Sequence, residues 1–442
     1  MTRRLRRATV VALVASAAML GGCTSGGPDP DPGTAAPSSA VASSGAGASS
    51  PAPDSIAAST GRSASSTAPT STSLVPLTPD GLQTGPGVEA DRITLGLLVD
   101  PKLDRGFSAG VRLWQSTINR TTGVCGRRIE LRAAEPSTGT DAAVADYREI
   151  APATLGLLTL SDSLVQSELA GRFVEDQIPA VTPIGRSADL SPWGPMIVGA
   201  TADILAINAE SYLVEAGIVR PGGELGVLTD GSADAVEELA GLQWFADRSG
   251  ITLRTFSDPA AADWAGVAAV AVLGGPALTR QALASTGPEV TVVTTLDGFD
   301  AAAIDPTWHG RLLVSTPTTA LDSDNPVAQA VMTAYTASGG TDPGPLLFAG
   351  YASGATWGRL LQQACSQANL TRAGIRAAAT DLPPAPADSL LGATDLRALV
   401  TDGLPATRVS AVSEADSQAP GGLSALTWLQ AAPGISDYVP GA

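Results

Sequence analysis

The segment "ITLGLLV", residues 93–99, indicates how this sequence is expected to fold. It is a short, nearly continuous apolar run, which is typical of a β-strand that is covered on both faces. Apolar residues then recur with helical spacing at Phe107, Val111, Trp114 and Ile118. The next predicted strand is "RRIELRAA" (127–134). The order strand, helix, strand predicts a parallel sheet built from right-handed crossovers.

The same alternation continues along the chain in two series. The first series goes on with predicted strands at 154–160 and 178–183, and the second contains predicted strands at 224–230, 251–257, 266–275, 289–295 and 310–316. Helical patterns separate most of these strands. We therefore expect an α/β protein made of two doubly wound parallel-sheet lobes.

The N-terminal residues carry an export pattern. Four arginines in "MTRRLRR" precede an apolar run at residues 8–20. A bilayer span needs about 20 apolar residues, so a cleaved signal is favoured over a transmembrane helix. The residues Leu20, Gly21, Gly22 and Cys23 that end the run resemble the lipobox of bacterial lipoproteins. The resemblance implies a signal peptide at 1–22 and a lipid on Cys23; an ordinary signal peptide that contains a cysteine is the alternative.

The composition changes after Cys23. Residues 23–90 are rich in Ser, Pro, Ala and Gly and have little apolar surface to bury, so we expect a disordered tether. The rest of the 442-residue chain is too long for one typical core and indicates two domains. The net charge of −17 argues against nucleic acid or an anionic lipid surface as a partner.

Several segments, taken in order, resemble the type I periplasmic binding proteins, specifically the branched-chain amino-acid-binding family of ABC importers. The matching pieces are "ITLGLLV" (93–99), "GVRLWQSTINRTTGVCGRRIELRAAE" (110–135), "IPAVTPIGRSADL" (178–190) and "FAGYASGATWGRLLQQA" (348–364). The resemblance implies two lobes joined by crossover hinges, with a ligand held between them. It implies a first lobe at 91–198 and 318–380 and a second lobe at 199–317 and 381–442.

This division places the two cysteines that remain after Cys23 in one lobe. Cys125 and Cys365 both fall in the first lobe, and the compartment outside the membrane is oxidising. We therefore expect a disulfide between them. Two separate buried thiols are the alternative.

Ligands of open α/β sheets bind at the carboxyl ends of the strands, where helix N-termini offer free N–H groups. In the first lobe these ends carry the loops 160–163, with Asp162 and Ser163, and 183–187, with Arg186 and Ser187. By resemblance, Ser163 would receive a ligand carboxylate, although a helix cap is its alternative role. Arg186 stands where the family has a threonine. It could bind a ligand carboxylate, or it could be a surface arginine that is paired with an acid. Ser187 could supply the hydroxyl group that the threonine provides in the family.

In the second lobe the family has an acid that pairs with the ammonium of an amino acid. Asp297, in "TTLDG" (294–298), stands at that position, and a turn-forming Asp-Gly pair is its alternative role. Two aromatic positions of the family are missing here, because "VDPKLDRGFS" (99–108) and "GGP" (274–276) carry no matching ring. The resemblance therefore does not define the ligand beyond an amino acid or another small polar or anionic solute.

No catalytic or metal-binding motif stands out. His309 is the only histidine, and the P-loop, Cys-x-x-Cys, His-Glu-x-x-His and Gly-x-Ser-x-Gly patterns do not occur. We expect no enzymatic activity, no metal and no cofactor. The expected function is that of a monomeric, membrane-tethered extracytoplasmic solute-binding protein that serves an ABC permease. The alternative is a lipoprotein that kept the fold but acts as a scaffold or sensor without transport.

Overall fold

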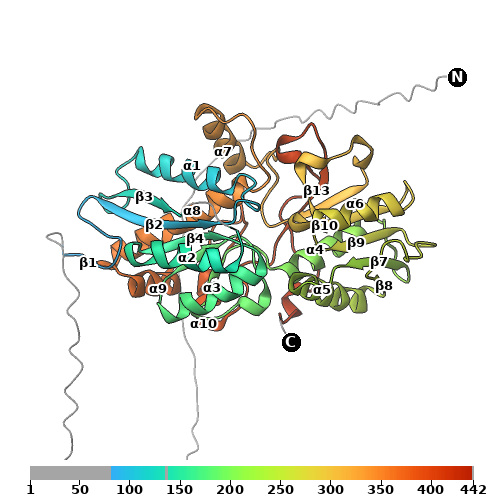
Figure 1. Ribbon diagram of the computed structural model, residues 1–442, viewed down its shortest axis with the longest axis horizontal. Coiled ribbons are helices and arrows are strands. Elements are labelled where there is room, and N and C mark those ends of the chain that lie inside the picture. The colour runs from blue at the N-terminus through green and yellow to red at the C-terminus, as the bar shows by residue number, and fades with distance from the viewer. Residues whose placement is uncertain (1–80, 135–137, 441–442) are drawn as a thin grey trace, which may run out of the picture. The chain divides into compact units, whose positions relative to one another are not determined.

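The computed structural model describes residues 81–134 and 138–440. Within this part, two parallel sheets with helices on their faces form the two lobes (Figure 1). The predicted signal peptide, the predicted lipidation site Cys23 and most of the predicted tether, up to residue 80, lie outside the described residues. Among the described residues, no helix combines the length and apolarity that crossing a bilayer requires.

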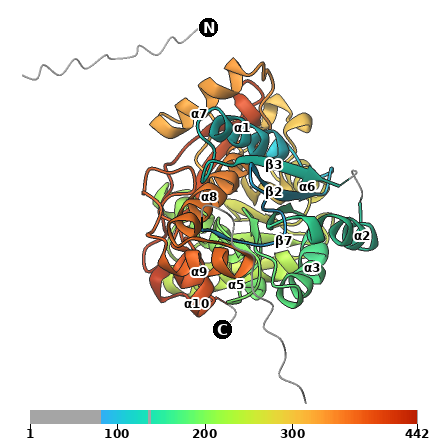
Figure 2. The ribbon, with the colours of Figure 1, turned by 90° about the vertical axis from the view of Figure 1, so that its left-hand side faces the viewer.

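The sheet of the first lobe has five parallel strands in the order β3-β2-β4-β5-β6. These strands are β2 (Arg92–Val99), β3 (Arg128–Ala133), β4 (Gly156–Leu160), β5 (Ala180–Thr182) and β6 (Met196–Ile197). Their helices are α1 (Phe107–Asn119), α2 (Thr140–Ile150), α3 (Ser163–Glu175), α8 (Leu347–Ser366), α9 (Arg372–Asp381) and α10 (Leu396–Asp402). Figure 2 views this lobe end-on.

Helices cover both faces of this sheet, which explains its continuous apolar strands. Leu157 packs in a cluster with residues of α2 and α3, while the next residue, Leu158, packs with residues of α1 and α8. Successive side chains of a strand point to opposite faces, so both must be apolar here. In β2, Leu97 packs with residues of α1 and α8 and Leu98 with residues of α2 and α3, so the prediction from "ITLGLLV" is confirmed.

The sheet of the second lobe has the order β14-β13-β11-β10-β9-β7-β8. The strands are β7 (Glu224–Thr229), β8 (Thr252–Phe256), β9 (Ala269–Leu273), β10 (Thr291–Thr295), β11 (Leu312–Thr316), β13 (Ala411–Ala415) and β14 (Leu423–Ala425). The helices α4 (Ala202–Glu215), α5 (Ala233–Ser249) and α6 (Pro276–Ser285) pack on it. The strands are parallel except β13 and β14, which run antiparallel to their neighbours.

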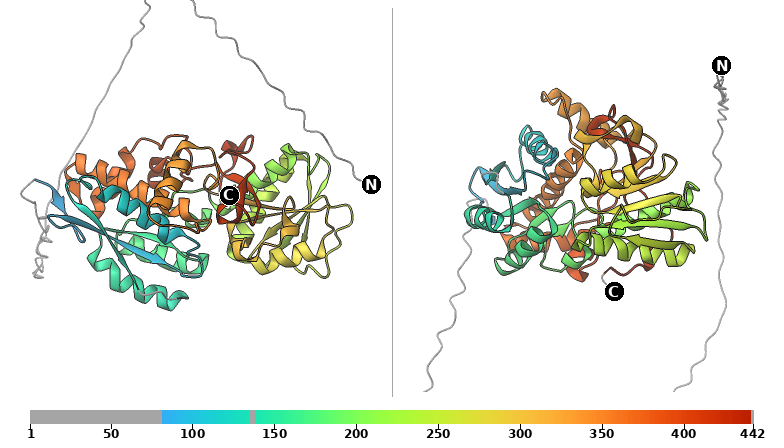
Figure 3. Two further views of the ribbon diagram at one scale, coloured as in Figure 1. Left: turned by 90° about the horizontal axis from the view of Figure 1, so that it is seen from above. Right: turned by 45° about the vertical axis from the view of Figure 1, so that its right-hand side comes forward.

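The chain crosses between the lobes three times. Figure 3 shows the two lobes from two further sides. It passes from β6 to α4, from β11 to α7 (Pro326–Ala337) and on to α8, and from α10 to β13. The first two crossings are close neighbours, because a Cβ atom added to Gly199 would meet the ring of Pro317. Such adjacent crossings are suited to act as a hinge.

Two boundaries differ from the expected division. β1 (Gln83–Thr84) pairs with β12 (Asn369–Leu370), so the ordered body begins before residue 91. The helix α10 packs against α9 and β6, so residues 381–402 accompany the first lobe instead of the second. Both differences arise from pairing between segments distant in sequence.

The predicted disulfide is confirmed. Cys125 and Cys365 are bonded, with their Cα atoms 6.1 Å apart, and they join the loop before β3 to the end of α8. Both residues lie in the first lobe, as the resemblance implied.

Short 3-10 helices complete the described chain. They are η1 (Ala151–Ala153), η2 (Ser187–Asp189), η3 (Leu296–Gly298), η4 (Ala301–Ala303), η5 (Pro306–Trp308), η6 (Pro420–Gly422) and η7 (Ile435–Asp437). Two of them, η2 and η3, follow strands at the edge where the lobes meet.

Candidate binding pocket

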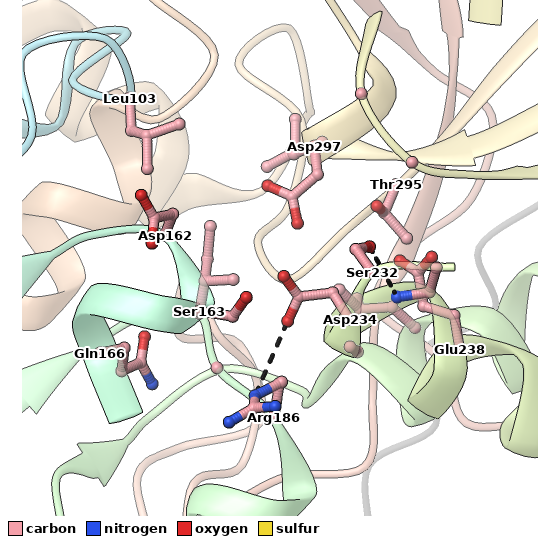
Figure 4. A pocket seen from close by; sticks show the side chains of 18 of the residues that line it. Leu103, Asp162, Ser163, Gln166, Arg186, Ser232, Asp234, Glu238, Thr295 and Asp297 are labelled. Atoms are coloured by element: carbon pink, nitrogen blue, oxygen red, sulfur yellow. Dashed lines mark hydrogen bonds and ion pairs between the residues drawn. The ribbon is translucent and has the colours of Figure 1, made fainter. Parts of the chain in front are cut away.

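A pocket of about 310 Å³ lies between the two lobes. Its walls come from the loops that follow β2, β4 and β5 of the first sheet and β7, β9 and β10 of the second. These are the carboxyl ends of the strands, where open α/β sheets bind ligands. Figure 4 shows the side chains that line this space.

Asp162 and Ser163 reach the pocket from the loop after β4. The Asp162 side chain accepts a hydrogen bond from the backbone N–H of Val165 at 2.9 Å and so caps α3. Ser163 is the first residue of that helix, so Asp162 and not Ser163 is the cap. The Ser163 side chain lowers the pKa of Asp234 in the second lobe. Both predicted residues line the pocket, and Asp162 also has a structural role.

Arg186 lines the pocket as well, but its charge is already paired. Its Nη2 and Nε donate to the two carboxylate oxygens of Asp189 at 2.9 and 3.2 Å. Asp234 lies 3.9 Å from Nε. The pairing with Asp189 is the alternative role considered for this arginine.

Ser187 does not line the pocket. Its hydroxyl is buried and donates to Asp203 at 2.7 and 2.8 Å. The hydroxyl of Tyr438 also donates to Asp203, at 2.8 Å. Ser187 thus belongs to a buried polar network that ties the first lobe to the start of α4 and to the C-terminal segment.

Asp297, on η3 after β10, lines the second-lobe wall together with Asp234 and Glu238. Asp234 and Glu238 are four residues apart at the start of α5, so they share one face of the helix. In Figure 4 the carboxylates of Asp297 and Asp234 point toward one another. With Asp230, which also lines the pocket, the structure adds three second-lobe acids to the one that the sequence predicted.

The protein around Asp297, Glu238 and Asp234 favours their protonated forms. Asp297 is open to the pocket, but the surrounding protein displaces bulk water and raises the pKa of its carboxyl to about 6, with Asp234 adding to the effect and Arg105 opposing it. Burial raises the pKa of Glu238 well above its usual range, with Asp297 adding to the effect and a hydrogen bond with Thr295 opposing it. Burial also raises the pKa of Asp234, against the effects of Ser163 and Arg186.

Two first-lobe residues of the pocket were also missed. Arg105 reaches across to the second lobe and donates from Nη1 to the backbone oxygens of Leu296 and Phe299 at 2.6 and 2.8 Å. Gln166, one turn into α3, is 6% exposed, and its Nε2 has no hydrogen-bond partner among the described residues. Arg105 follows β2, so the rule that ligands bind at the carboxyl ends of strands could have found it. Gln166 lies three residues after Ser163 in α3, and this helical spacing was the sequence signal that could have found it.

The fold matches solved structures of solute-binding proteins. A fatty acid ABC transporter substrate-binding protein from Thermomonospora curvata is 21% identical, with a TM-score of 0.73 over 83% of this chain and 98% of that one. A substrate-binding protein from Desulfitobacterium hafniense in complex with Leu is 18% identical, with a TM-score of 0.63 over 76% of this chain and 100% of that one. An R. palustris solute-binding protein in complex with benzoate is 15% identical, with a TM-score of 0.58 over 77% of this chain and 98% of that one.

Sequence comparison assigns the family. No curated protein matches this sequence closely enough to be counted as a relative. The family model described as periplasmic binding protein, however, matches residues 101–418, which is well over half of the chain. This chain belongs to the periplasmic binding protein family.

Proposed function

We propose that this protein is the solute-binding component of an ABC importer, anchored outside the cell membrane by a lipid on Cys23. The observation that carries the proposal is the pocket between the lobes, which is lined by strand ends of both sheets. Membership of the periplasmic binding protein family makes the chain a solute binder and not an enzyme. The related structures named above are ABC transporter or solute-binding proteins, two of them with a small organic ligand.

Contacts across the pocket support a mechanism in which the lobes close on the solute. The Glu237 carboxylate on α5 accepts hydrogen bonds from the backbone N–H groups of Ser187 and Ala188, at 2.7 and 3.0 Å. Arg105 bonds to second-lobe carbonyls at another side of the pocket. These bonds exist only while the lobes are together. A solute that touches both lobes favours this closed state, which the permease would then recognise.

The rival function is a scaffold or sensor that keeps the fold without transport. A scaffold has no need of an open cavity lined by charged groups, because burying unpaired charge costs stability. The retained pocket of about 310 Å³ therefore favours solute binding.

A thermal-shift screen tests the proposal directly. Amino acids, amines, amides, ureas and small acids would be added to the purified protein. A true ligand at 100 times its dissociation constant should stabilise the folded state by about 2.7 kcal/mol. If no solute of any class shifts the melting temperature, the scaffold function is favoured instead.

The lipid anchor makes a separate prediction. In a detergent phase partition, the unchanged protein is expected in the detergent phase and the variant Cys23→Ser in the aqueous phase, because the variant lacks the thiol that carries the lipid. Several acyl chains, at about 0.8 kcal/mol per buried CH₂, would hold the unchanged protein to the bilayer. Thr24→Ser, next to Cys23 in the sequence, is the control and should stay with the membrane. Equal membrane association of both variants would contradict lipidation at Cys23.

A further inference from the structure

The pocket holds many more carboxyl groups than cations. Its basic side chains are Arg105 and Arg186. Its acidic side chains are Asp162, Asp189, Asp230, Asp234, Glu238 and Asp297. Even with Glu238 protonated because of its raised pKa, five carboxyl groups face two guanidinium groups. Such a surplus of negative charge in a partly dehydrated space repels an anion and attracts a cation.

Both arginines are already occupied by protein acceptors. Arg105 bonds to two backbone carbonyls at 2.6 and 2.8 Å, and Arg186 makes a two-pronged pair with Asp189. Arg105 uses only Nη1 for these bonds, but its charge already acts on the Asp297 carboxyl, so a ligand carboxylate at Arg105 would meet that acid. A ligand carboxylate at Arg186 would have to displace Asp189 and would then lie beside Asp234.

The acids of the second lobe, in contrast, are placed to receive a cation. Asp234 and Asp297 point toward one another, and Glu238 lies one helical turn from Asp234 (Figure 4). Asp234 raises the pKa of both Asp297 and Glu238, and Asp297 raises the pKa of Glu238. An ammonium group placed among them would relieve this repulsion and replace the missing counter-charge.

The rest of the wall is suited to a hydrocarbon body with one neutral polar group. Six bulky aliphatic side chains line the pocket: Leu103, Leu160, Ile184, Leu205, Leu296 and Leu346. Gln166, more than nine-tenths buried, also lines it, and its side-chain nitrogen has no hydrogen-bond partner among the described residues. A buried amide without a partner costs free energy, and a hydroxyl or carbonyl oxygen on the ligand would supply one.

From these observations we infer that the preferred solute is a small amine cation with an apolar body and a neutral oxygen, and without a carboxylate. This inference rests on the proposed function, because it names the class of solute that the same pocket would take. It narrows the expectation from the sequence, which was an amino acid or another small polar or anionic solute.

Matched compounds separate the groups of the ligand. Binding to the full chain in detergent would be measured by titration calorimetry with leucinol, leucine, 4-methylpentan-1-ol and 4-methylpentanoate, and with the corresponding four phenylalanine-derived compounds. At least one amino alcohol is expected to bind tenfold or more tightly than its amino acid, and the compounds without an amine should bind weakest. If an amino acid or an acid binds as tightly, the inference fails while the proposed function stands. If none of the eight binds, the inference fails, and the wider screen above decides on the function.

Variants test the acids themselves. Asp297→Asn and Asp234→Asn should each weaken binding of the amino alcohol by tenfold or more while the melting temperature of the free protein confirms a folded chain. Asp324→Asn removes the same charge at an exposed site outside the pocket and should leave the affinity unchanged. Unchanged affinity in both pocket variants would overturn the inference.

The pH dependence gives a second readout. Because the pKa of Asp297 is raised to about 6, this carboxyl is mostly protonated at pH 5 and mostly ionised at pH 7. Affinity for the amine should therefore rise roughly tenfold over this interval in the unchanged protein and much less in Asp297→Asn. An affinity that falls as the pH rises would contradict binding of a cation by these carboxylates.

Discussion

Replacing Gly350 by alanine is expected to lower the free energy of unfolding by at least about 2–4 kcal/mol, or to prevent folding. Gly350 is a buried residue of α8, and a Cβ atom added to it would overlap the backbone carbonyl of Phe107 in α1. At the same crossing, a Cβ on Gly110 of α1 would overlap the carbonyl of Leu347 in α8. The two helices approach through their backbones, so no side-chain rotation can relieve the overlap.

Gly171→Ala is a matched control. Gly171 also lies inside a helix, α3, but it is exposed, and an added Cβ atom would meet nothing within 4 Å. Alanine favours helix over glycine, so this variant should gain about 0.5–1 kcal/mol. Denaturant unfolding followed by circular dichroism measures both variants. Equal stability of Gly350→Ala and the unchanged protein would mean that α1 and α8 are not in backbone contact there.

Gly350 lies in the segment 348–364, one of the segments that resemble the periplasmic binding proteins. The resemblance by itself gives no physical reason for a glycine at this position. The structure supplies one, because the glycine lets α8 reach α1. The loop that carries Arg105 leads directly into α1, so the close approach also positions a residue of the pocket.

The lobes were predictable because their strands are apolar on both faces. β2 was expected at 93–99 and is found at Arg92–Val99, and β11 was expected at 310–316 and is found at Leu312–Thr316. The strands β13 and β14 at one end of the second sheet were missed, because a short segment of mixed polarity such as "AVSEA" carries no strong period. Pairing with β11, nearly 100 residues earlier in sequence, makes this segment a strand.

The pocket was predictable only where it follows the ends of strands. Asp162, Ser163, Arg186 and Asp297 were found because each lies in such a loop, and all four line the pocket. Glu238 lies inside α5, where an acid on a helix normally faces water, and only the approach of η3 makes it a pocket residue.

Ser187 differs from its neighbour Arg186 for a tertiary reason. Ser187 lies in the same loop after β5, but its side chain is buried and not in the pocket. The buried Asp203 carboxylate at the start of α4 needs hydrogen-bond donors, and the Ser187 hydroxyl is one of them. No local pattern in the sequence signals that demand, since Asp203 comes from the next helix along the chain.

Glu210 in α4 leads to the second large prediction, a loss of stability as the pH rises. Its side chain is 1% exposed, and neither carboxyl oxygen has a hydrogen-bond partner among the described residues. Burial, with a smaller contribution from Asp247, raises the pKa of this carboxyl to about 9 from an ordinary value of 4.5. The folded protein therefore keeps a proton that the unfolded chain releases above about pH 5.

The sign follows from this difference in bound protons. The contribution of Glu210 is fully present below pH 4.5 and is lost as the pH rises toward 9, at a rate of up to about 1.4 kcal/mol per pH unit. Other acids of the protein also titrate in this range, so the comparison must be made between variants. In Glu210→Gln the ionisation is removed, and its stability relative to the unchanged protein should increase steadily between pH 5 and pH 9.

Glu215→Gln, in the same helix, is the control because Glu215 is exposed. It should change stability by less than about 0.5 kcal/mol, with no trend in pH over this range. Glu210→Met removes the buried polar atoms as well and should stabilise the protein by about 1–3 kcal/mol at pH 7. Urea unfolding at several pH values measures all three variants. A difference between Glu210→Gln and the unchanged protein that stays constant from pH 5 to pH 9 would mean that Glu210 is not held protonated in the folded state.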